Sequence, residues 1–233
     1  MKFNISHSSR VTTPSLTGRV RGGSLFLLLI FFLISCSSDD GEYDPYHDWQ
    51  ERNEVWYELI ADSARTAINA AKAQYGNAWE DHCRWRMFKT LTEAPNRQSE
   101  TLTDSVCVYI LSNGTGDVSP AYTDSIRVHF RATLMPTVDA DGNTENTVFA
   151  QTYYGPFDPT KAAPAKYGLG GLIAGFSTAV QYMVKGDDWI VYIPSDLGYG
   201  ATATTQVPAY STLRYRINLA EIYETGDEVP DWQ

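Results

Sequence analysis

The most informative part of the chain reads GLGGLIAGFSTAVQYMVKGDDWIVYIPSDLGYG at residues 168–200 and VPAYSTLRYRINLAEIY at residues 207–223. Its hydrophobic periodicity predicts a short helix over 172–184, a strand over 188–193 and a long final strand over 212–223. The two stretches contain aromatic and aliphatic side chains, glycines and one tyrosine after a strand. They show no pattern of a catalytic nucleophile, a metal cluster or a phosphate loop. This composition suits chemistry in which no covalent bond is made or broken.

Further strands are predicted upstream by apolar and polar residues that alternate with a period of two. They cover residues 85–91, 105–111 and 125–134. Residues 136–168 are rich in Pro, Gly, Asp and Thr, which predicts loops around one short strand at 147–152. Many strands with one short helix across them indicate an α+β fold with a twisted antiparallel sheet wrapped over that helix.

An amphipathic helix is predicted before the first strand. Apolar residues recur at helical spacing over 55–75 and end at Gly76, with Asp44 as the N-cap and Pro45 at the first helical position. A break is expected near Asn53. We expect the apolar stripe to pack on the protein's own sheet. The alternative is a helix that dimerises or binds client proteins.

The N-terminus carries a targeting pattern. Basic residues up to Arg21 precede an apolar run at 25–34, which is too short to span a bilayer, and Cys36 follows. The segment resembles a bacterial lipoprotein signal, and Ser37-Ser38-Asp39-Asp40 after it resembles the signal that sends some Bacteroidetes lipoproteins to the cell surface. The resemblance implies cleavage before Cys36, lipidation of that cysteine and a location in the outer membrane of a Gram-negative bacterium, periplasmic or surface-exposed. An ordinary signal peptide with an unrelated cysteine is the alternative.

The charge balance excludes one class of partner. The net charge is −10, and removal of residues 1–35, which carry four basic and no acidic residues, would change it to −14. An acidic surface repels phosphate backbones, so we expect no nucleic-acid binding. With Cys36 lipidated, Cys83 and Cys107 remain, and the sequence leaves open whether they form a disulfide or stay free thiols.

Five segments in order resemble the FKBP-type peptidyl-prolyl cis-trans isomerases. They read DSIRVHF, VFAQ, LIAGFSTAVQYMVKGD, IPSDLGYG and VPAYSTLRYRINL, from Asp124 to Leu219. The resemblance implies an enzyme that acts on X–Pro bonds of proline-containing proteins, as a folding helper in the cell envelope. It implies neither a metal nor another cofactor.

The family's reaction has a simple physical basis. An X–Pro bond isomerises over a barrier of roughly 18–20 kcal/mol and takes tens of seconds or more unaided. In the transition state the amide is twisted, so its carbonyl is less dipolar than in the planar ground state. A dry apolar pocket disfavours the planar, hydrated amide relative to the twisted one, and each ~1.4 kcal/mol of that difference is a factor of ten in rate.

The resemblance also assigns candidate residues. Three are expected to act on the reacting amide: the Tyr199 hydroxyl and the Ile173 backbone N–H would donate hydrogen bonds to the substrate, and the Phe176 ring would form the pocket floor. The expected substrate-binding residues around them are Phe130, Phe149, Leu172, Val207 and Tyr215.

This sequence departs from the family pattern on one side of the pocket. Where the family has a tyrosine hydrogen-bonded to an aspartate, this chain has Phe130 and Ala150. Losing both polar partners together costs little stability, whereas losing one would leave the other unpaired. Ala165 stands where a wall phenylalanine is usual, which predicts an open side. These departures favour an alternative function, a weak or inactive module that binds proline-containing or apolar segments.

The predicted organisation therefore has five parts. They are a lipoprotein signal (1–35), a tether (36–43), an N-terminal helical segment (44–80), an FKBP-like domain (81–225) and a C-terminal tail (226–233).

Overall fold

The computed structural model describes residues 43–91 and 101–232, which lie in one compact unit spanning Glu42–Gln233. The expected signal segment, the Cys36 lipidation site and all but the last residue of the expected tether fall outside the described residues. No helix in the described part of the chain is long and apolar enough to cross a membrane.

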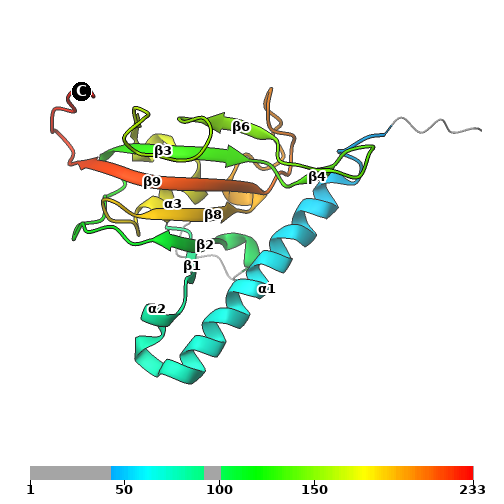
Figure 1. Cartoon of the computed structure of the whole chain (residues 1–233), viewed down its shortest axis with the longest axis horizontal. Helices are drawn as coiled ribbons and strands as arrows, with labels where there is room; N and C mark the ends of the chain where they lie inside the picture. Colours follow the sequence, from blue (N-terminus) through cyan, green and yellow to red (C-terminus); the bar gives the residue numbers. More distant parts are fainter. Residues whose placement is uncertain (1–42, 92–100, 233) are drawn as a thin grey trace, which may run out of the picture. The chain divides into compact units, whose positions relative to one another are not determined.

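One twisted antiparallel sheet forms the body of this unit (Figure 1), and the α+β prediction is confirmed. The strand order is β1-β2-β8-β9-β3-β6, with β7 also paired to β3. The strands are β1 (Trp85–Lys89), β2 (Ser105–Ser112), β3 (Ser125–Thr133), β6 (Val148–Gln151), β7 (Ala165–Gly168), β8 (Asp188–Ile193) and β9 (Leu213–Tyr223). All the predicted strands form within about two residues of their expected ends. The sequence did not predict β7.

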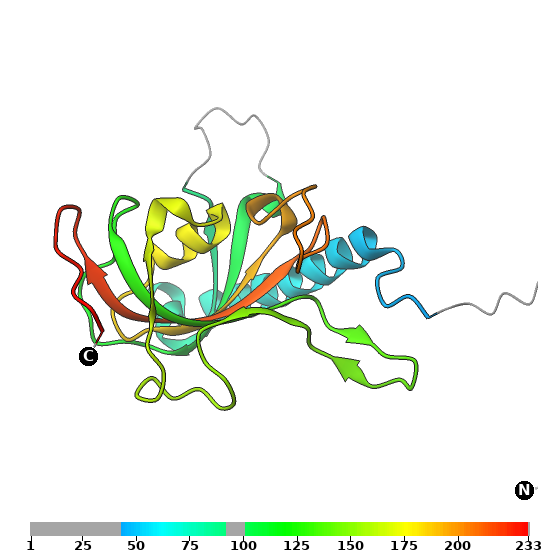
Figure 2. The same cartoon turned by 90° about the horizontal axis from the view of Figure 1, so that it is seen from above.

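The short helix α3 (Ala174–Val180) lies on the concave side of the sheet, which curves around it (Figure 2). Close packing here depends on Gly175, because a Cβ at that position would stand 2.3 Å from Cγ2 of Ile193 on β8. The helix ends before the predicted residue 184. The chain turns at Gly186, whose φ is +94°, and the Asp187 carboxylate accepts the Val184 N–H at 2.8 Å.

A long helix, α1 (Trp49–Tyr75), crosses the opposite face of the sheet (Figure 1). Side chains of β2 alternate between the two faces: Val106 and Val108 join the core on the α3 side, whereas Cys107 packs under α1. Tyr57, Ala61 and Ala64 of α1 are buried with Cys107. The expectation that the helix packs on the protein's own sheet is therefore confirmed.

The predicted start of this helix is wrong. Oδ1 of Asp44 accepts the Tyr46 N–H at 2.8 Å and forms a turn, and the residue before the helix is Asp48, with a left-handed φ of 48°. The expected break at Asn53 is also absent, because its side chain donates to the Trp49 carbonyl at 2.7 Å within a continuous helix. The predicted stop at Gly76 is confirmed, and the short helices η1 (Gly76–Ala78) and α2 (Trp79–His82) follow.

Residues 136–168, which were expected to be mainly loops, contain small additional strands. β4 (Thr137–Val138) and β5 (Thr144–Glu145) form a separate hairpin. The Asp139 carboxylate closes its turn by accepting the Asn143 N–H at 2.7 Å. β7 was not predicted because Ala-Lys-Tyr-Gly is too short for its alternation to indicate a strand. Its pairing with β3 is a long-range contact that local sequence does not encode.

The loop between β6 and β7 covers another part of the outer face. The Phe157 ring lies edge-on to His129 on β3, with ring centroids 5.5 Å apart, and the Arg216 guanidinium stacks on it at 4.7 Å. Burial lowers the pKa of His129, and its Nδ1 has no hydrogen-bond partner among the described residues. His129 is therefore a packed structural residue on the face away from α3.

Both cysteines in the described region are free thiols, which answers the question left open by the sequence. The Cys107 thiol donates to the Tyr57 oxygen at 3.5 Å beneath α1, and burial raises its pKa to about 11. Cys83 is half-buried and precedes β1. The fold is thus stabilised by packing, without a covalent link between β1 and β2.

Candidate functional site

A cavity of about 300 Å³ opens between α3 and the strands that curve around it. Its volume lies at the lower end of the range for small-ligand pockets. It is lined by Phe130 of β3, Ala150 of β6, Tyr167 of β7, Gly171, Leu172, Ile173, Phe176 of α3, Tyr199 and Tyr215 of β9.

Aromatic rings form the floor and walls of this cavity. Phe176 is only 4% exposed, and its ring lies edge-on to Phe130 and Tyr215 at centroid distances of 6.3 and 5.3 Å. The Phe130 backbone is fixed to the residue that follows β6, because its N–H donates to the Thr152 hydroxyl at 2.9 Å. These rings form a rigid apolar surface, since edge-to-face aromatic pairs stabilise one another beyond simple burial.

Tyr199 reaches the cavity from the loop that follows β8 and η4 (Ser195–Leu197). The loop is closed by two backbone hydrogen bonds, from Gly200 N–H to the Ser195 carbonyl at 2.9 Å and from Tyr210 N–H to the Gly200 carbonyl at 2.7 Å. Tyr199 itself is 37% exposed. Its hydroxyl is therefore available both to the cavity and to solvent.

Six of the eight residues expected from the sequence line this cavity. They are Tyr199, Ile173, Phe176, Phe130, Leu172 and Tyr215. Phe149 and Val207 do not. Phe149 is buried behind Tyr215 with ring centroids 5.7 Å apart, and Val207 is 2% exposed with its N–H bonded to Thr204 Oγ1. Neither residue lines the cavity, and Phe149 contacts it only through the Tyr215 ring.

The expectation that Ala165 leaves one side open is wrong. Tyr167 stands two residues further along β7, and its side chain therefore points to the same face of the strand. Its ring lies 6.2 Å from that of Phe130, and it lines the cavity. An aromatic side chain two residues beyond the expected position was the only sequence signal for this wall.

The polar groups in the lining are tyrosine hydroxyls. Phe130 and Ala150 meet on the β3–β6 side without any side-chain polar atom. On the β9 side, burial raises the pKa of Tyr215, and the neighbouring hydroxyls of Tyr199 and Tyr167 raise it further. The cavity therefore has an apolar wall at Phe130 and Ala150, and its side-chain polar groups are the hydroxyls of Tyr167, Tyr199 and Tyr215.

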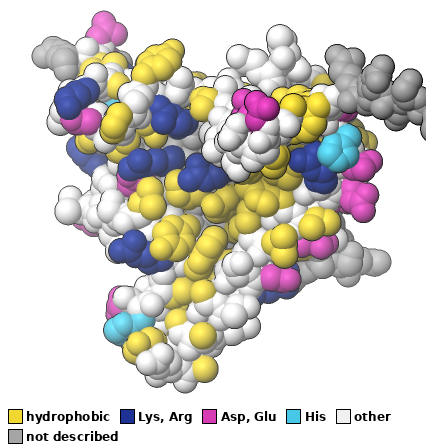
Figure 3. All heavy atoms as spheres, turned by 45° about the vertical axis from the view of Figure 1, so that its right-hand side comes forward, with side chains coloured by type: hydrophobic (Ala, Val, Ile, Leu, Met, Phe, Trp, Pro, Cys, Tyr) yellow, Lys and Arg dark blue, Asp and Glu magenta, His cyan; other side chains and the backbone are white. Residues whose placement is uncertain are grey.

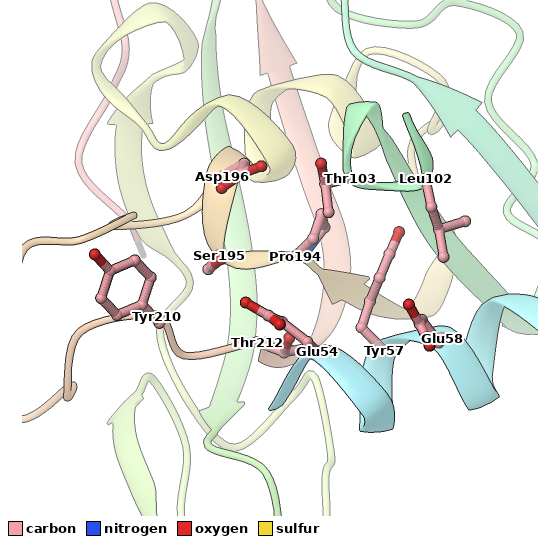
Figure 4. A pocket seen from close by; sticks show the side chains of 10 residues that line it. All are labelled: Glu54, Tyr57, Glu58, Leu102, Thr103, Pro194, Ser195, Asp196, Tyr210 and Thr212. Carbon is pink, nitrogen blue, oxygen red and sulfur yellow. The ribbon is translucent and has the colours of Figure 1, made fainter. Parts of the chain in front are cut away.

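A second cavity, of about 200 Å³, lies where α1 meets the domain loops (Figure 4). Its side chains come from α1 on one side and from η2 (Leu102–Asp104), η4 and the segment before β9 on the other. Glu54, Glu58 and Asp196 make it acidic. Within residues 43–91 and 101–232, no group of three or more His, Cys, Asp or Glu side chains is arranged to hold a metal ion.

The N-terminal half of α1 leaves hydrophobic side chains uncovered. Val55 and Leu59 are 48% and 61% exposed, next to Trp56 and Met135. Figure 3 shows hydrophobic side chains gathered in a band on the face that α1 crosses, with basic side chains above it. The packing of α1 on the sheet therefore buries only part of its apolar surface. The exposed part is the surface that the alternative role of this helix, dimerisation or binding of client proteins, would use.

The family model of the FKBP-type peptidyl-prolyl cis-trans isomerases matches residues 116–220, which contain the whole lining of the first cavity. Residues 116–220 are therefore similar to this family. The FKBP-type 22 kDa isomerase of Escherichia coli K12 is 29% identical over 136 residues, which cover 58% of each chain. The macrophage infectivity potentiator of Trypanosoma cruzi is 28% identical over 117 residues, covering 50% of this chain and 52% of that protein.

Another relative matches over a similar number of residues. Outer membrane protein MIP of Legionella longbeachae is 29% identical over 48% of this chain and 42% of its own length. The chain thus spans about half the length of the curated relatives it matches. Among solved structures, FkpA of Escherichia coli is similar with 18% identity and a TM-score of 0.42, over 80% of this chain and 76% of that one. An isomerase of Pseudomonas syringae has 22% identity and a TM-score of 0.41, over 72% and 96%.

Proposed function

We propose that this chain is a peptidyl-prolyl cis-trans isomerase whose active site is the aromatic cavity beside α3. The observation that carries the proposal is the combination of an apolar floor at Phe176 with the Tyr199 hydroxyl in the same lining. A proline ring would fit against the floor, and the Tyr199 hydroxyl and the Ile173 N–H would hold carbonyl groups of the bound segment. The apolar walls would favour the twisted amide over the planar one, because the twisted form has the smaller dipole.

A second candidate function is binding without turnover. It is favoured by one observation, the absence of a polar side chain on the cavity wall formed by Phe130 and Ala150. A pocket that holds apolar groups but lacks groups selective for the twisted amide would bind both forms alike. Uniform binding of that kind does not accelerate the chemical step.

A proline-isomerisation assay on the purified chain separates the two functions. We expect the wild type to accelerate isomerisation of a proline-containing tetrapeptide and Tyr199→Phe to lower kcat/KM about tenfold, the effect of one hydrogen bond of ~1.4 kcal/mol. Tyr192→Phe is the matched control, since Tyr192 lies on β8 in the cluster under α1. It should retain wild-type kcat/KM.

The remaining outcomes assign the function in the same experiment. Peptide binding by a wild type that gives no acceleration would contradict the enzyme and favour the binding module. The double variant Phe130→Tyr with Ala150→Asp reintroduces a hydroxyl and a carboxylate on the apolar wall. A weakened enzyme should gain activity from it.

We also propose that the chain acts in the envelope of a Gram-negative bacterium on X–Pro bonds of folding proteins, anchored by a lipid on Cys36. The support is the short apolar run before Cys36 and the similarity to a relative named as an outer membrane protein. In the same proposal, residues 1–35 are the signal, 36–43 the tether, 44–80 the helical segment, 81–225 the isomerase domain and 226–233 the tail.

Cys36→Ala tests the anchor. We expect the wild type in the membrane fraction and the variant in the soluble fraction of its host. The reason is that stable membrane binding depends on acyl chains buried in the bilayer, and the variant cannot carry them at residue 36. The mass of the intact wild-type chain should include those acyl chains. Membrane retention of the variant, or an unmodified mass, would contradict lipidation at Cys36.

A further inference from the structure

The loop that carries Tyr199 is not held by burial of its own tip. The tip, residues 201–206, is exposed throughout, and the first buried side chain after it is Val207. The loop is closed instead at its base, where the Tyr210 N–H donates to the Gly200 carbonyl at 2.7 Å. Tyr210 has a left-handed φ of 59°, which a non-glycine residue keeps only where its surroundings fix it. Whatever fixes the base of the loop therefore also fixes Tyr199, which directly precedes Gly200.

The base of the loop is hydrogen-bonded to the first residue of α1. The Trp49 indole N–H donates to the Ser211 hydroxyl oxygen at 2.9 Å, and the Ser211 hydroxyl donates to the Pro208 carbonyl at 2.7 Å. Trp49 is 8% exposed and Ser211 is 3% exposed, so both side chains are shielded from water. Hydrogen bonds are stronger in such a low-dielectric interior than in water. The indole thus holds the backbone on both sides of Tyr210.

Trp49 is itself held by neighbours on its own segment. The Asn53 side chain donates to the Trp49 carbonyl at 2.7 Å, and its Oδ1 accepts the Thr212 N–H at 2.9 Å. The Tyr46 ring lies edge-on to the indole, with ring centroids 4.9 Å apart. α1 therefore binds two consecutive residues at the base of the loop, Ser211 through Trp49 and Thr212 through Asn53.

We propose, building on the isomerase function above, that Trp49 is a positioning residue that acts on Tyr199 through the base of the loop. The path consists of the indole bond to Ser211, the loop-closing bond of the preceding residue, and the peptide link from Gly200 to Tyr199. Trp49 lies outside residues 116–220, the region that the family model matches. The helix before the isomerase domain is thus part of the support of the active site.

The position of the Tyr199 hydroxyl matters because a group that acts on the reacting amide must be held in place. Tyr199 is 37% exposed, so the contacts of its own ring restrain it only in part. A displacement of about 1 Å in such a group, caused by a change far from the chemistry, can lower the rate by a large factor. Loss of the indole bond should therefore reduce turnover although Trp49 does not line the cavity.

Trp49→Phe tests the indole N–H, because it keeps a buried aromatic ring and removes the donor. We expect kcat/KM for a proline-containing tetrapeptide to fall about fourfold, within the range of one neutral hydrogen bond. Ser211→Ala removes the acceptor and should have a similar effect, and the two changes together should lower kcat/KM no further. Tyr57→Phe is the matched control, since it removes a donor from the same helix whose partner is the Ser105 carbonyl on β2. It should retain wild-type kcat/KM.

A second background separates positioning from a loss of stability. Because Trp49 is expected to act through the Tyr199 hydroxyl, Trp49→Phe should lower kcat/KM less than about 1.5-fold in the Tyr199→Phe protein. A loosened fold would reduce activity by the same factor in both backgrounds, and that result would overturn the proposal. Wild-type activity in both Trp49→Phe and Ser211→Ala would overturn it as well.

Backbone order parameters from ¹⁵N relaxation test the same contact without turnover. We expect the amides of Gly200 and Tyr210 to fall from about 0.85 in the wild type toward about 0.6 in Trp49→Phe, while the amide of Ile217 on β9 keeps its value. Tyr57→Phe should leave all three unchanged. Failure of the isomerase function would be seen separately, as a wild type that gives no acceleration. The order parameters would then decide alone, and unchanged values at Gly200 and Tyr210 in Trp49→Phe would overturn the role of α1.

Discussion

Replacing Asn53 by alanine is expected to lower the free energy of unfolding by about 2–4 kcal/mol, although Asn53 lies on α1, outside the region that the family model matches. Asn53 is fully buried. Its Oδ1 accepts the Thr212 N–H at 2.9 Å, and the Thr212 hydroxyl donates to the backbone carbonyl of Asn53 at 3.2 Å. Truncation removes the acceptor and leaves the buried Thr212 N–H unpaired, which costs more than the loss of an exposed bond.

Urea unfolding followed by far-UV circular dichroism measures this effect. Gln50→Ala is the matched control, because Gln50 is exposed on the same helix and bonds the side chain of Glu54, one turn further along. It should change stability by less than about 0.5 kcal/mol. Equal midpoints for Asn53→Ala and the wild type would mean that α1 is not fastened to the start of β9.

Replacing Phe176 by alanine is expected to have the largest effect on both stability and activity. Phe176 is 4% exposed and forms the floor of the aromatic cavity. Loss of a buried phenylalanine typically costs 3–5 kcal/mol, so we expect about 4 kcal/mol. Water would then reach the bound amide and stabilise its planar form. We expect kcat/KM to fall about 100-fold, equivalent to ~2.7 kcal/mol.

Two further variants keep this prediction testable if Phe176→Ala does not fold. Phe176→Leu retains most of the volume and should still lose about tenfold in kcat/KM, because an aliphatic side chain no longer forms the flat floor. Phe157→Ala makes the same truncation on the opposite side of the sheet, where Phe157 is half-buried over His129. Its kcat/KM should remain at the wild-type level. Loss of activity in Phe157→Ala and none in Phe176→Leu would contradict the assignment of the floor.

Most of the fold could be predicted from the sequence because its signals are local. Alternating residues in β2, β3, β8 and β9 gave strands close to the observed ones, since the side-chain period of a strand is visible in any short window. The start of α1 could not be predicted in this way. The Asp44-Pro45 pair has the composition of a helix N-terminus, but it forms a turn that is closed by the Asp44 carboxylate.

The candidate site could likewise be predicted only where its residues belong to local sequence motifs. Tyr199, Ile173 and Phe176 lie in one contiguous segment, so the order of motifs was enough to bring them forward as candidates. Tyr167 was not found, because the strand that carries it exists only through its pairing with β3. Phe149 and Val207 were assigned to the lining but lie behind it. Which side of a wall faces the cavity depends on how separate segments pack.

The sequence by itself therefore determined where the strands and the short helix lie along the chain, the resemblance to the isomerase family, and the aromatic character of the pocket, because periodicity and ordered motifs are properties of the chain alone. Only the tertiary structure decided which side chains meet. It joined Asn53 of α1 to Thr212, placed Tyr167 in the cavity wall and brought Tyr199 and Tyr215 from separate elements into one lining. These contacts connect residues far apart in the chain or on separate elements, and their geometry depends on the registers of the sheet and on the packing of both helices against it.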